Sequence, residues 1–480
     1  MRPLLRGLLA AALLITAPGL GLAVPAAAAA QGDTRTADSR SADIRDRLAA
    51  IPGMKVTEEK PTTTGHRYFL LTYTQPIDHA RPWRGTFEQR FSVLHRADDR
   101  PTVFYTNGYT LGTNPSRTEP TRLTDGNQVS IEYRYFTPSR PEPADWTKAG
   151  IEQAAADAHR LITALKSVYR GAWISTGASK GGMSSVYHRR FYPHDVDGTV
   201  AYVAPNDVND REDSAYTAFF RQVGTPECRA ALNTAQRELL ARRATLEPRY
   251  AADNAAQGNT FETVGSADRG YEVGVLDVVW AFWQYSGEAD CAEVPPATAT
   301  DDQLYAWFDT HSGVTSNSDA SLAGYTAYYY QAGTQLGAPT FDVSHLKDLL
   351  HYDYRELYSP RSYVPRSIPM RFDPSAMRDV DRWVRNSAQR IIFVYGQNDP
   401  WGAERFGLGR GSRDSYVYTA AGANHGAKIG SLGAAESAAA TAKLRDWAGL
   451  AEAPTLAPGR GIPPFGELDA EGLKQERHRL

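Results

Sequence analysis

Three scarcities in this 480-residue chain narrow what it can be. Only 2 cysteines occur, too few for a disulfide-dense scaffold or a four-cysteine zinc site. Beyond the N-terminus no stretch approaches the ~20 uninterrupted apolar residues of a membrane-spanning helix. Basic residues are not in excess, because 52 Lys and Arg stand against 55 Asp and Glu, which argues against a nucleic-acid-binding protein. What is present, 42% hydrophobic and 11% aromatic residues, is enough to build a large folded core.

The first thirty residues have the three parts of a secretory signal. Arg2 and Arg6 precede an apolar run at residues 8–16, and the small-residue stretch 25–30 offers A-x-A cleavage sites. A membrane anchor is the alternative, which we disfavour because the run is short and Pro18 and Gly19 interrupt it. We therefore expect residues 1–30 to be a signal peptide and the mature protein to be secreted, extracellular and not attached to a membrane.

Export bears directly on the two cysteines, Cys228 and Cys291. In an oxidising compartment a single bridge between them is the simplest arrangement. It would close a loop of about 63 residues, worth roughly 4 kcal/mol in the chain-entropy model. Two unrelated buried thiols are the alternative.

The apolar pattern predicts an α/β domain in the first half of the mature chain. Alternating or continuous apolar runs indicate strands, and three- and four-residue spacing indicates helices, the first of them with Asp145 as its N-cap. Strand–helix–strand alternation favours a parallel sheet covered on both faces. The predicted strands are residues 68–73, 87–94, 102–106, 128–136, 172–176 and 198–203, and the predicted helices are 151–168 and 180–191.

After residue 207 the pattern becomes helical, and strand signals return at 391–395 and 415–419, followed by a helix at 434–448. We therefore expect one sheet domain in two parts, interrupted by an insertion. The predicted organisation is a leader or pro-segment with little core of its own at 31–60, an α/β sheet core at 61–207 and 386–450, a helical cap insertion at 208–385, and a surface tail at 451–480.

A G-x-S-x-G motif stands between a predicted strand and a predicted helix, as Gly177-Ala178-Ser179-Lys180-Gly181. This is the pattern of a nucleophile elbow, in which a tight, strained turn leaves the serine hydroxyl projecting above the sheet edge. The flanking glycines avoid collisions with the neighbouring strand and helix. The motif occurs often by chance, but here the strand before it and the helix after it are the context that it requires.

An acid and a histidine follow in the order that such an elbow requires. Asp399 lies in the turn after the 391–395 strand, and His425 lies in a Gly-flanked loop after the 415–419 strand. A turn aspartate and a solvated loop histidine are the alternatives. Asp414 is a rival acid, but it precedes its strand and so belongs to the wrong sheet edge. We expect Ser179 as nucleophile, His425 as general base and Asp399 as the group that orients the imidazole.

The oxyanion of an acyl-transfer reaction needs two hydrogen-bond donors. One is the backbone N–H of Lys180, directly after the serine. The other is expected from the loop after the 102–106 strand, where Gly108 and Tyr109 are the candidates. An ordinary turn is the alternative for that loop.

Several segments together carry a family resemblance: GASKGGMSS, TVAYVAPND, FWQYSGEADC, YTAYYYQAG, GQNDPW and GANHG. With them, residues 68–447 resemble the secreted actinobacterial prolyl tri- and tetrapeptidyl aminopeptidases and, more distantly, the lysosomal Pro-X carboxypeptidase and dipeptidyl peptidase group. The resemblance implies an α/β-hydrolase core with a helical lid between the sixth and seventh strands. It also implies a serine exopeptidase that releases short N-terminal peptides, often with Pro before the cut, and the triad Ser179, Asp399 and His425.

An aminopeptidase must bind the free ammonium of an oligopeptide substrate, and a partly desolvated carboxylate does this best. The sequence offers Glu132 at a strand end, with pairing to Arg134 as the alternative. It also offers the acidic segment at the start of the insertion, with a solvated loop as the alternative. That segment holds Asp207, Asp210, Glu212 and Asp213.

A flat proline ring packs well on aromatic faces. One or two of seven insertion aromatics are therefore expected to reach substrate: Trp280, Phe282, Trp283, Tyr285, Tyr328, Tyr329 and Tyr330. An esterase or lipase on the same scaffold and a catalytically silent binding protein remain competing hypotheses. We expect no cofactor and no metal, because the 11 histidines form no H-E-x-x-H or comparable cluster.

Overall fold

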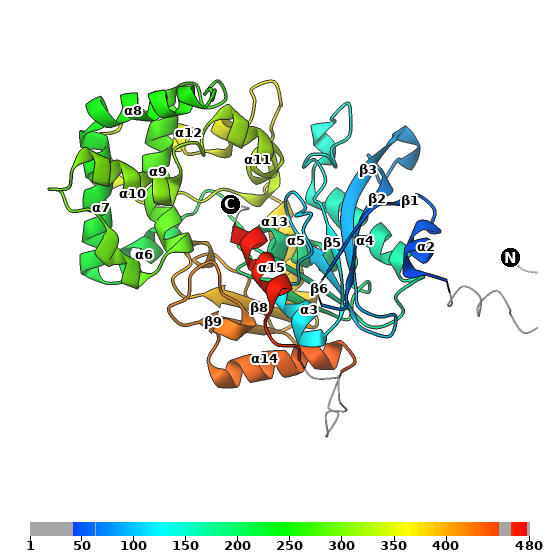
Figure 1. Ribbon diagram of the computed structural model, residues 1–480. Helices are drawn as coiled ribbons and strands as arrows, with labels where there is room; N and C mark the ends of the chain where they lie inside the picture. Colours follow the sequence, from blue (N-terminus) through cyan, green and yellow to red (C-terminus); the bar gives the residue numbers. More distant parts are fainter. Residues whose placement is uncertain (1–41, 63, 451–461, 478–480) are drawn as a thin grey trace, which may run out of the picture. The chain divides into compact units, whose positions relative to one another are not determined.

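The computed structural model describes residues 42–62, 64–450 and 462–477, so the predicted signal peptide at residues 1–30 lies outside the described residues. One nine-stranded sheet, in the order β1-β2-β3-β5-β4-β6-β7-β8-β9, runs through the molecule (Figure 1). Its strands are β1 (Met54–Lys60), β2 (Arg67–Pro76), β3 (Thr86–His95), β4 (Thr102–Thr106), β5 (Asn127–Ile131), β6 (Trp173–Ala178), β7 (Gly198–Tyr202), β8 (Ile391–Gly396) and β9 (Tyr416–Ala420).

The sheet is antiparallel at its N-terminal edge and parallel elsewhere. Strands β1, β2, β3 and β5 pair antiparallel in turn. Strands β5, β4, β6, β7, β8 and β9 pair parallel. The carboxyl ends of the parallel strands therefore lie at one edge, where loops that carry function gather in open α/β sheets. A mostly parallel sheet with helices on both faces confirms the predicted α/β-hydrolase class.

Alternation of apolar side chains explains how the helices cover the sheet. Val103, Val200 and Ile392 share a cluster with the helices of one face, α3 and α14. Phe104 packs with α4, and Phe393 packs with α5 and α13, on the other face. These helices are α3 (Glu119–Thr124), α4 (Ile151–Leu165), α5 (Lys180–Phe191), α13 (Ala376–Ser387) and α14 (Ala434–Trp447).

Two boundaries differ from the sequence prediction. Strand β5 ends at Ile131 instead of continuing to residue 136, because the chain turns there and Tyr135 has a φ of 71°. Asp145 does not cap the long helix; it caps the short 3-10 helix Trp146–Lys148, and Gly150 precedes α4. In both cases a turn intervenes that the local pattern did not indicate: one interrupts the apolar run after Ile131, and the other separates Asp145 from the long helix.

The segment predicted as a leader with little core of its own is part of the fold from residue 44 onward. Helix α2 (Ile44–Ala49) buries Ile44 and Leu48 in the same cluster as Phe69 and Val129, and β1 forms the edge strand. The alternation of apolar and polar residues in β1 is weak because β1 is an edge strand and one of its sides is exposed to water. The polar composition of the segment concealed this role.

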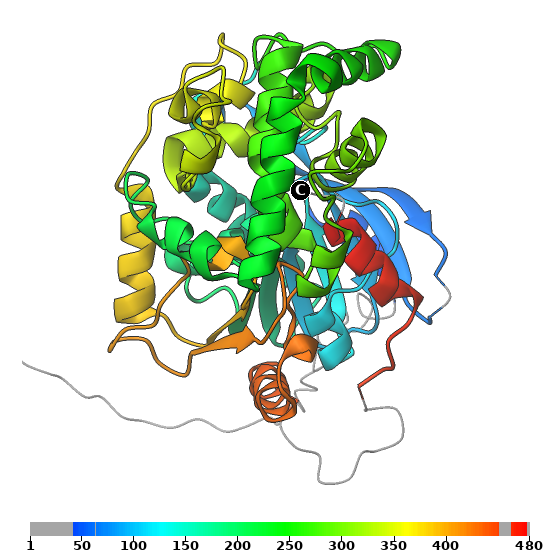
Figure 2. The same ribbon diagram turned by 90° about the vertical axis from the view of Figure 1, so that its left-hand side faces the viewer.

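The C-terminal segment also differs from the surface tail that composition predicted. Helix α15 (Glu467–Arg477) lies beside α3 in both views of the ribbon (Figures 1 and 2). The side chain of Arg117 forms two hydrogen bonds with the Asp469 carboxylate, at 2.8 and 2.6 Å, and both side chains are buried. Leu468 is buried against Leu111.

Between β7 and β8 the described chain is helical and has a hydrophobic core of its own. The long helix α9 stands in the middle of this cap (Figure 2). The cap helices are α6 (Ser214–Gln222), α7 (Pro226–Ala241), α8 (Arg243–Ala256), α9 (Ala267–Tyr285), α10 (Asp301–Ser312), α11 (Asp319–Gln331) and α12 (Tyr354–Leu357). Helix α13, assigned to the insertion from the sequence, instead packs on the sheet through Met377, Val380 and Val384.

Cys228 and Cys291 form a disulfide with a Cα–Cα distance of 5.4 Å. The bond joins the first turn of α7 to the short 3-10 helix Glu288–Glu293, so both ends lie in the cap. Among the residues that the structure describes, no helix has the length and apolar character needed to cross a bilayer.

Candidate active site

Ser179 occupies a strained turn between β6 and α5. Its backbone has φ 55° and ψ −127°. Residues other than glycine rarely adopt this conformation, and those that do are concentrated at functional sites. Gly177 and Gly181 make the turn possible, because a Cβ on either would collide with the carbonyl oxygen of Thr106. The helix that follows points its N-terminal end, where negative charge is favoured, at the same place.

Asp399 and His425 are in direct contact at the carboxyl edge of the sheet. Nδ1 of His425 lies 2.7 Å from Oδ2 of Asp399, and both side chains are buried. The other Asp399 oxygen accepts the backbone N–H of Trp401 at 3.0 Å. Nε2 of His425 is buried and has no hydrogen-bond partner among the described residues. The imidazole is thus oriented on one side and available on the other.

The rival acid Asp414 is used elsewhere. Its carboxylate accepts hydrogen bonds from Nε1 of Trp447 and from the hydroxyl of Tyr416, and pairs with Lys443. It belongs to the contact between α14 and the start of β9, at the opposite edge from Ser179.

The loop after β4 packs backbone to backbone on the elbow. Gly108 has φ +82°, and a Cβ there would lie 2.6 Å from the backbone nitrogen of Gly181. The backbone N–H of Tyr109 has no acceptor among the described residues. Burial raises the pKa of the Tyr109 phenol well above its ordinary value, and the nearby Ser179 hydroxyl opposes that rise. The loop therefore brings donors without an acceptor to the elbow: the backbone N–H of Tyr109 and its buried hydroxyl.

A cavity opens above Ser179 between the core and the cap. It holds about 400 Å³ of space free of protein atoms, part of it open to solvent. Its lining residues are Ser179, Lys180, Met183, Pro205, Asp207, Tyr216, Tyr328, Leu336, Gly337, Pro339 and Trp401.

Asp207 is the carboxylate in this cavity. Only 5% of the residue is exposed, and neither side-chain oxygen has a hydrogen-bond partner among the described residues. Burial, with the nearby charges of Glu404, Asp210 and Asp213, raises its pKa to about 8, and the nearby backbone N–H of Asn209, which is outside hydrogen-bond geometry, opposes the rise only in part. Burial likewise raises the pKa of Glu404 to about 7. A cation bound beside such an acid would favour its ionised form and lower its pKa, because the pair then replaces the missing solvent.

The other acids of this segment are differently placed. Glu212 is exposed and accepts a hydrogen bond from the backbone N–H of Ser214, so its predicted role in substrate binding is not supported by its position. Asp210 accepts from the backbone N–H of Ala338, and Asp213 accepts from the Thr340 hydroxyl.

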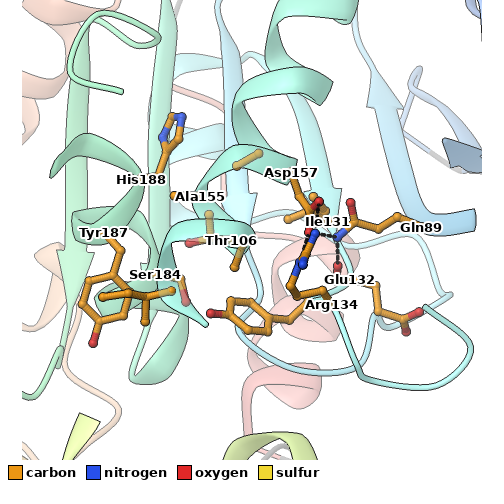
Figure 3. A pocket seen from close by; sticks show the side chains of 14 residues that line it. Gln89, Thr106, Ile131, Glu132, Arg134, Ala155, Asp157, Ser184, Tyr187 and His188 are labelled. Atoms are coloured by element: carbon orange, nitrogen blue, oxygen red, sulfur yellow. Dashed lines mark hydrogen bonds and ion pairs between the residues drawn. The ribbon is translucent and has the colours of Figure 1, made fainter. Parts of the chain in front are cut away.

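Glu132 does not face the cavity. Its carboxylate is buried and holds Arg90 at 2.5 Å, the Ser139 hydroxyl at 2.6 Å and the backbone N–H of Leu111 at 2.9 Å. The predicted role of Glu132 in substrate binding is therefore not supported by its position, and the alternative partner Arg134 instead forms two hydrogen bonds with Asp157. Figure 3 shows Arg134 directed at Asp157 and the Glu132 carboxylate turned away from them. In a continuous strand residues 132 and 134 would share one side. Strand β5 ends at Ile131, however, and the turn that follows, where Tyr135 has a φ of 71°, separates Glu132 from Arg134.

Of the seven insertion aromatics, Tyr328 lines the cavity. Phe282 and Trp283 are buried in the cap core, as is Trp280, whose ring meets Trp401 with centroids 4.8 Å apart. Trp401 was missed as a cavity residue, although it follows the Asp399-Pro400 turn in the sequence.

The cap also forms hydrogen bonds with the loop that carries His425. Gln284, near the end of α9, accepts the backbone N–H of His425 on its own carbonyl and the Nε1 proton of Trp401 on its side chain. Gln284 lies in the FWQYSGEADC segment that carries the family resemblance, but the sequence did not indicate this contact, because it joins residues more than a hundred positions apart. No group of three or more His, Cys, Asp or Glu side chains within the described ranges is arranged to hold a metal ion.

The fold, with a strained serine at the carboxyl edge of a parallel sheet, defines a serine hydrolase. The chain belongs to the PS-10 peptidase S37 family, which matches residues 37–478. A prolyl tri/tetrapeptidyl aminopeptidase of Streptomyces mobaraensis is 54% identical over 473 residues, covering 98% of this chain and 97% of that protein. The protein is accordingly a serine-type aminopeptidase, as its sequence predicted.

Solved structures with a similar chain course are much more distant. The peroxisomal α/β-hydrolase Lpx1 of Saccharomyces cerevisiae is 9% identical with a TM-score of 0.35, covering 87% of this chain and 97% of that one. The proline iminopeptidase of Mycobacterium smegmatis is 12% identical with a TM-score of 0.35, covering 78% and 98%.

Proposed function

We propose that this protein is a secreted exopeptidase that releases tripeptides or tetrapeptides from the free N-terminus of oligopeptides, with proline preceding the cut. The observation that carries the proposal is Asp207, whose unpartnered carboxylate lies in the same cavity as Ser179. A buried acid without a partner is unfavourable for folding, so its presence beside a nucleophile is best explained by a cationic ligand. The ammonium of a peptide N-terminus is such a ligand.

In the proposed mechanism Ser179, His425 and Asp399 act as a catalytic triad. The Ser179 oxygen attacks the carbonyl carbon before the cut while Nε2 of His425 takes its proton. The C–N bond then breaks, and His425 gives that proton to the leaving amine, which leaves the N-terminal peptide as an ester on Ser179. Water, deprotonated by His425, hydrolyses the ester and regenerates the hydroxyl. Asp399 keeps Nδ1 protonated and stabilises the imidazolium throughout.

The developing oxyanion would be held by the backbone N–H groups of Lys180 and of Tyr109 or Gly108. The cavity supports the preference for proline, because Tyr216, Tyr328 and Trp401 offer flat apolar faces to a pyrrolidine ring. Binding of the ammonium at Asp207 would limit the length of the released peptide, since it would fix the distance from the N-terminus to Ser179.

Secretion is proposed on the signal-like N-terminus and on the disulfide. The bond between Cys228 and Cys291 requires an oxidising compartment to form and persist. Mass spectrometry of the protein from culture medium tests this proposal, with cleavage before Gln31 expected. A full-length intracellular chain would contradict it.

A substrate panel tests the proposed activity. Free-amine tripeptidyl-prolyl amides are expected to be cleaved, and N-acetylation is expected to lower kcat/KM by about 10² or more, because the ion pair with Asp207 is lost. Asp207→Asn should lower kcat/KM for the free-amine substrate and leave the weak rate on the acetylated substrate unchanged. Equal turnover of both substrates would contradict the aminopeptidase assignment.

The same panel separates the competing functions. Short acyl esters cleaved in preference to every peptide would indicate an esterase. No turnover at all, with no labelling of Ser179 by a fluorophosphonate, would indicate a catalytically silent binding protein.

A further inference from the structure

Lys180 follows the candidate nucleophile and buries its amine. The residue is 1% exposed, and Nζ donates to the carbonyl oxygen of Gly108 at 2.9 Å. Nζ also lies 3.2 Å from the centre of the Tyr133 ring. No carboxylate within the described part of the chain forms an ion pair with it. Burial lowers the pKa of this amine well below its ordinary value.

An amine buried without an acid is costly, and a residue such as methionine would fill the same space at lower cost. Packing therefore does not explain a lysine here. What a lysine provides here and a methionine cannot is a hydrogen-bond donor, and its amine uses that capacity to bind the carbonyl oxygen of Gly108. This contact joins the helix that carries Ser179 to the loop after β4.

The bonded carbonyl belongs to the peptide between Gly108 and Tyr109. In a planar trans peptide the C=O and the N–H point in opposite directions, so holding the carbonyl also sets the direction of the Tyr109 N–H. That N–H has no acceptor among the described residues, and its loop packs on the elbow that carries Ser179, at the backbone of Gly181. Lys180 thus contributes twice to the place where an oxyanion would form, by its own backbone N–H and by orienting the second donor.

Other contacts hold the flanks of the same loop. The backbone N–H of Tyr133 donates to the Tyr109 carbonyl at 3.0 Å, and Glu132 holds the N–H of Leu111. These bonds anchor the next two peptides but leave the rotation of the Gly108–Tyr109 peptide to Lys180. A glycine with φ +82° makes that rotation easy, because it lacks the side chain that would restrict it.

We infer that the side chain of Lys180 is a positioning residue of the oxyanion hole, which orients the Tyr109 N–H through the Gly108 carbonyl. The inference rests on the proposed role of Ser179 as nucleophile. It predicts a specific kinetic effect, because a misdirected donor weakens binding of the transition state and leaves binding of the ground state unchanged.

The test is Lys180→Met, which fills the site without a donor. The expected result is a fall in kcat of about 10- to 100-fold at an unchanged KM, on the scale known for oxyanion donors. The affinity for a free-amine peptide aldehyde, whose adduct with Ser179 places an oxygen in the hole, should fall by the same factor as kcat/KM. The affinity for the released peptide should not change.

A matched control lies on the same helix. Arg189 is also buried and also donates to backbone carbonyls, those of Val196 and Gln389, away from the cavity. Arg189→Met is expected to lower the Tm while kcat stays within about two-fold of the native value. If Lys180→Met does not fold, the same measurements are made on Lys180→Gln, whose shorter side chain cannot place a donor at the same point near the Gly108 carbonyl.

The outcomes are distinguishable. A folded Lys180 variant with native kcat, or one whose loss appears only in KM, would overturn the inference. Fluorophosphonate labelling of the native enzyme at a residue other than Ser179 would instead overturn the proposed function. A loss of kcat matched by the loss of aldehyde affinity, with the Arg189 control active, supports the positioning role.

Discussion

Gly337 packs directly on the carboxylate of Asp207. A Cβ at Gly337 would lie 2.6 Å from the carboxyl carbon and would collide with Oδ2. The glycine therefore keeps open the space beside an acid that has no partner among the described residues. Because Gly337 lies in a loop of the cap, its substitution can test the proposed ammonium site without changing Asp207 or the candidate nucleophile Ser179.

Gly337→Ala is expected to raise KM for free-amine peptides by about ten-fold or more, because the methyl group occupies the space beside Asp207. Steady-state kinetics with the free-amine and acetylated substrates measure the effect. Gly258→Ala is the control, since Gly258 has a similar φ of +74° and nothing within 4 Å. A variant at Gly337 with native KM would show that the ammonium lies elsewhere.

Asp207 should make stability depend on pH. Its pKa is raised from 3.8 to about 8, so between these values the folded protein keeps a proton that the unfolded chain has lost. Its contribution to stability is present below pH 4 and is lost as pH rises to 8. Asp207→Asn cannot ionise, so its Tm relative to the native protein should rise between pH 5 and pH 8. Thermal unfolding across that range measures the difference; a constant difference would contradict the raised pKa.

Ser179→Ala and Asp399→Asn test the proposed triad. Both should lower kcat by about 10⁴ or more while the protein stays folded, because each removes a group that acts on the reacting atoms or holds the imidazole tautomer. Asp414→Asn serves as the control, since Asp414 bonds Trp447 away from the cavity. If Asp399→Asn kept full activity and Asp414→Asn were inactive, Asp414 and not Asp399 would be the acid of the triad.

Removing the disulfide should weaken the cap. The double change Cys228→Ser and Cys291→Ser is expected to lower the free energy of unfolding by roughly 4 kcal/mol, because the unfolded chain regains the freedom of a 63-residue loop. Denaturant titration with and without reductant measures this. Reductant should destabilise the native protein and leave the variant unaffected; equal sensitivity would argue against the bond.

The contact of α15 with the core should be worth several kcal/mol. Asp469→Ala leaves Arg117 buried without its partner, which typically costs about 3–5 kcal/mol. A double change to Arg117→Met and Asp469→Leu should recover much of that loss, because no charge then remains buried. Urea unfolding of the three proteins measures the difference. An Asp469→Ala variant of native stability would show that the helix does not contribute.

Local sequence patterns predicted those helices, strands and turns whose formation depends mainly on interactions between residues near one another in the sequence. Strand β4 and helix α5 begin and end where apolar periodicity placed them, and Ser179, Asp399 and His425 each follow the end of a strand. The errors lie where long-range contacts decide the outcome. Polar composition predicted loose ends, yet Leu48 and Leu468 are buried by elements far away in the sequence.

By itself the sequence determined the class of the fold, the family resemblance and the order of the candidate nucleophile, acid and histidine, because periodicity and turn chemistry act over a few residues. Only the tertiary structure decided which acid enters the cavity, since Asp207 and Glu212 are equivalent in composition and differ in burial. It also decided that Glu132 holds the loop after β4 and that Lys180 reaches Gly108. Desolvation and hydrogen bonding between distant segments determine these roles, and neither can be seen until the chain has folded.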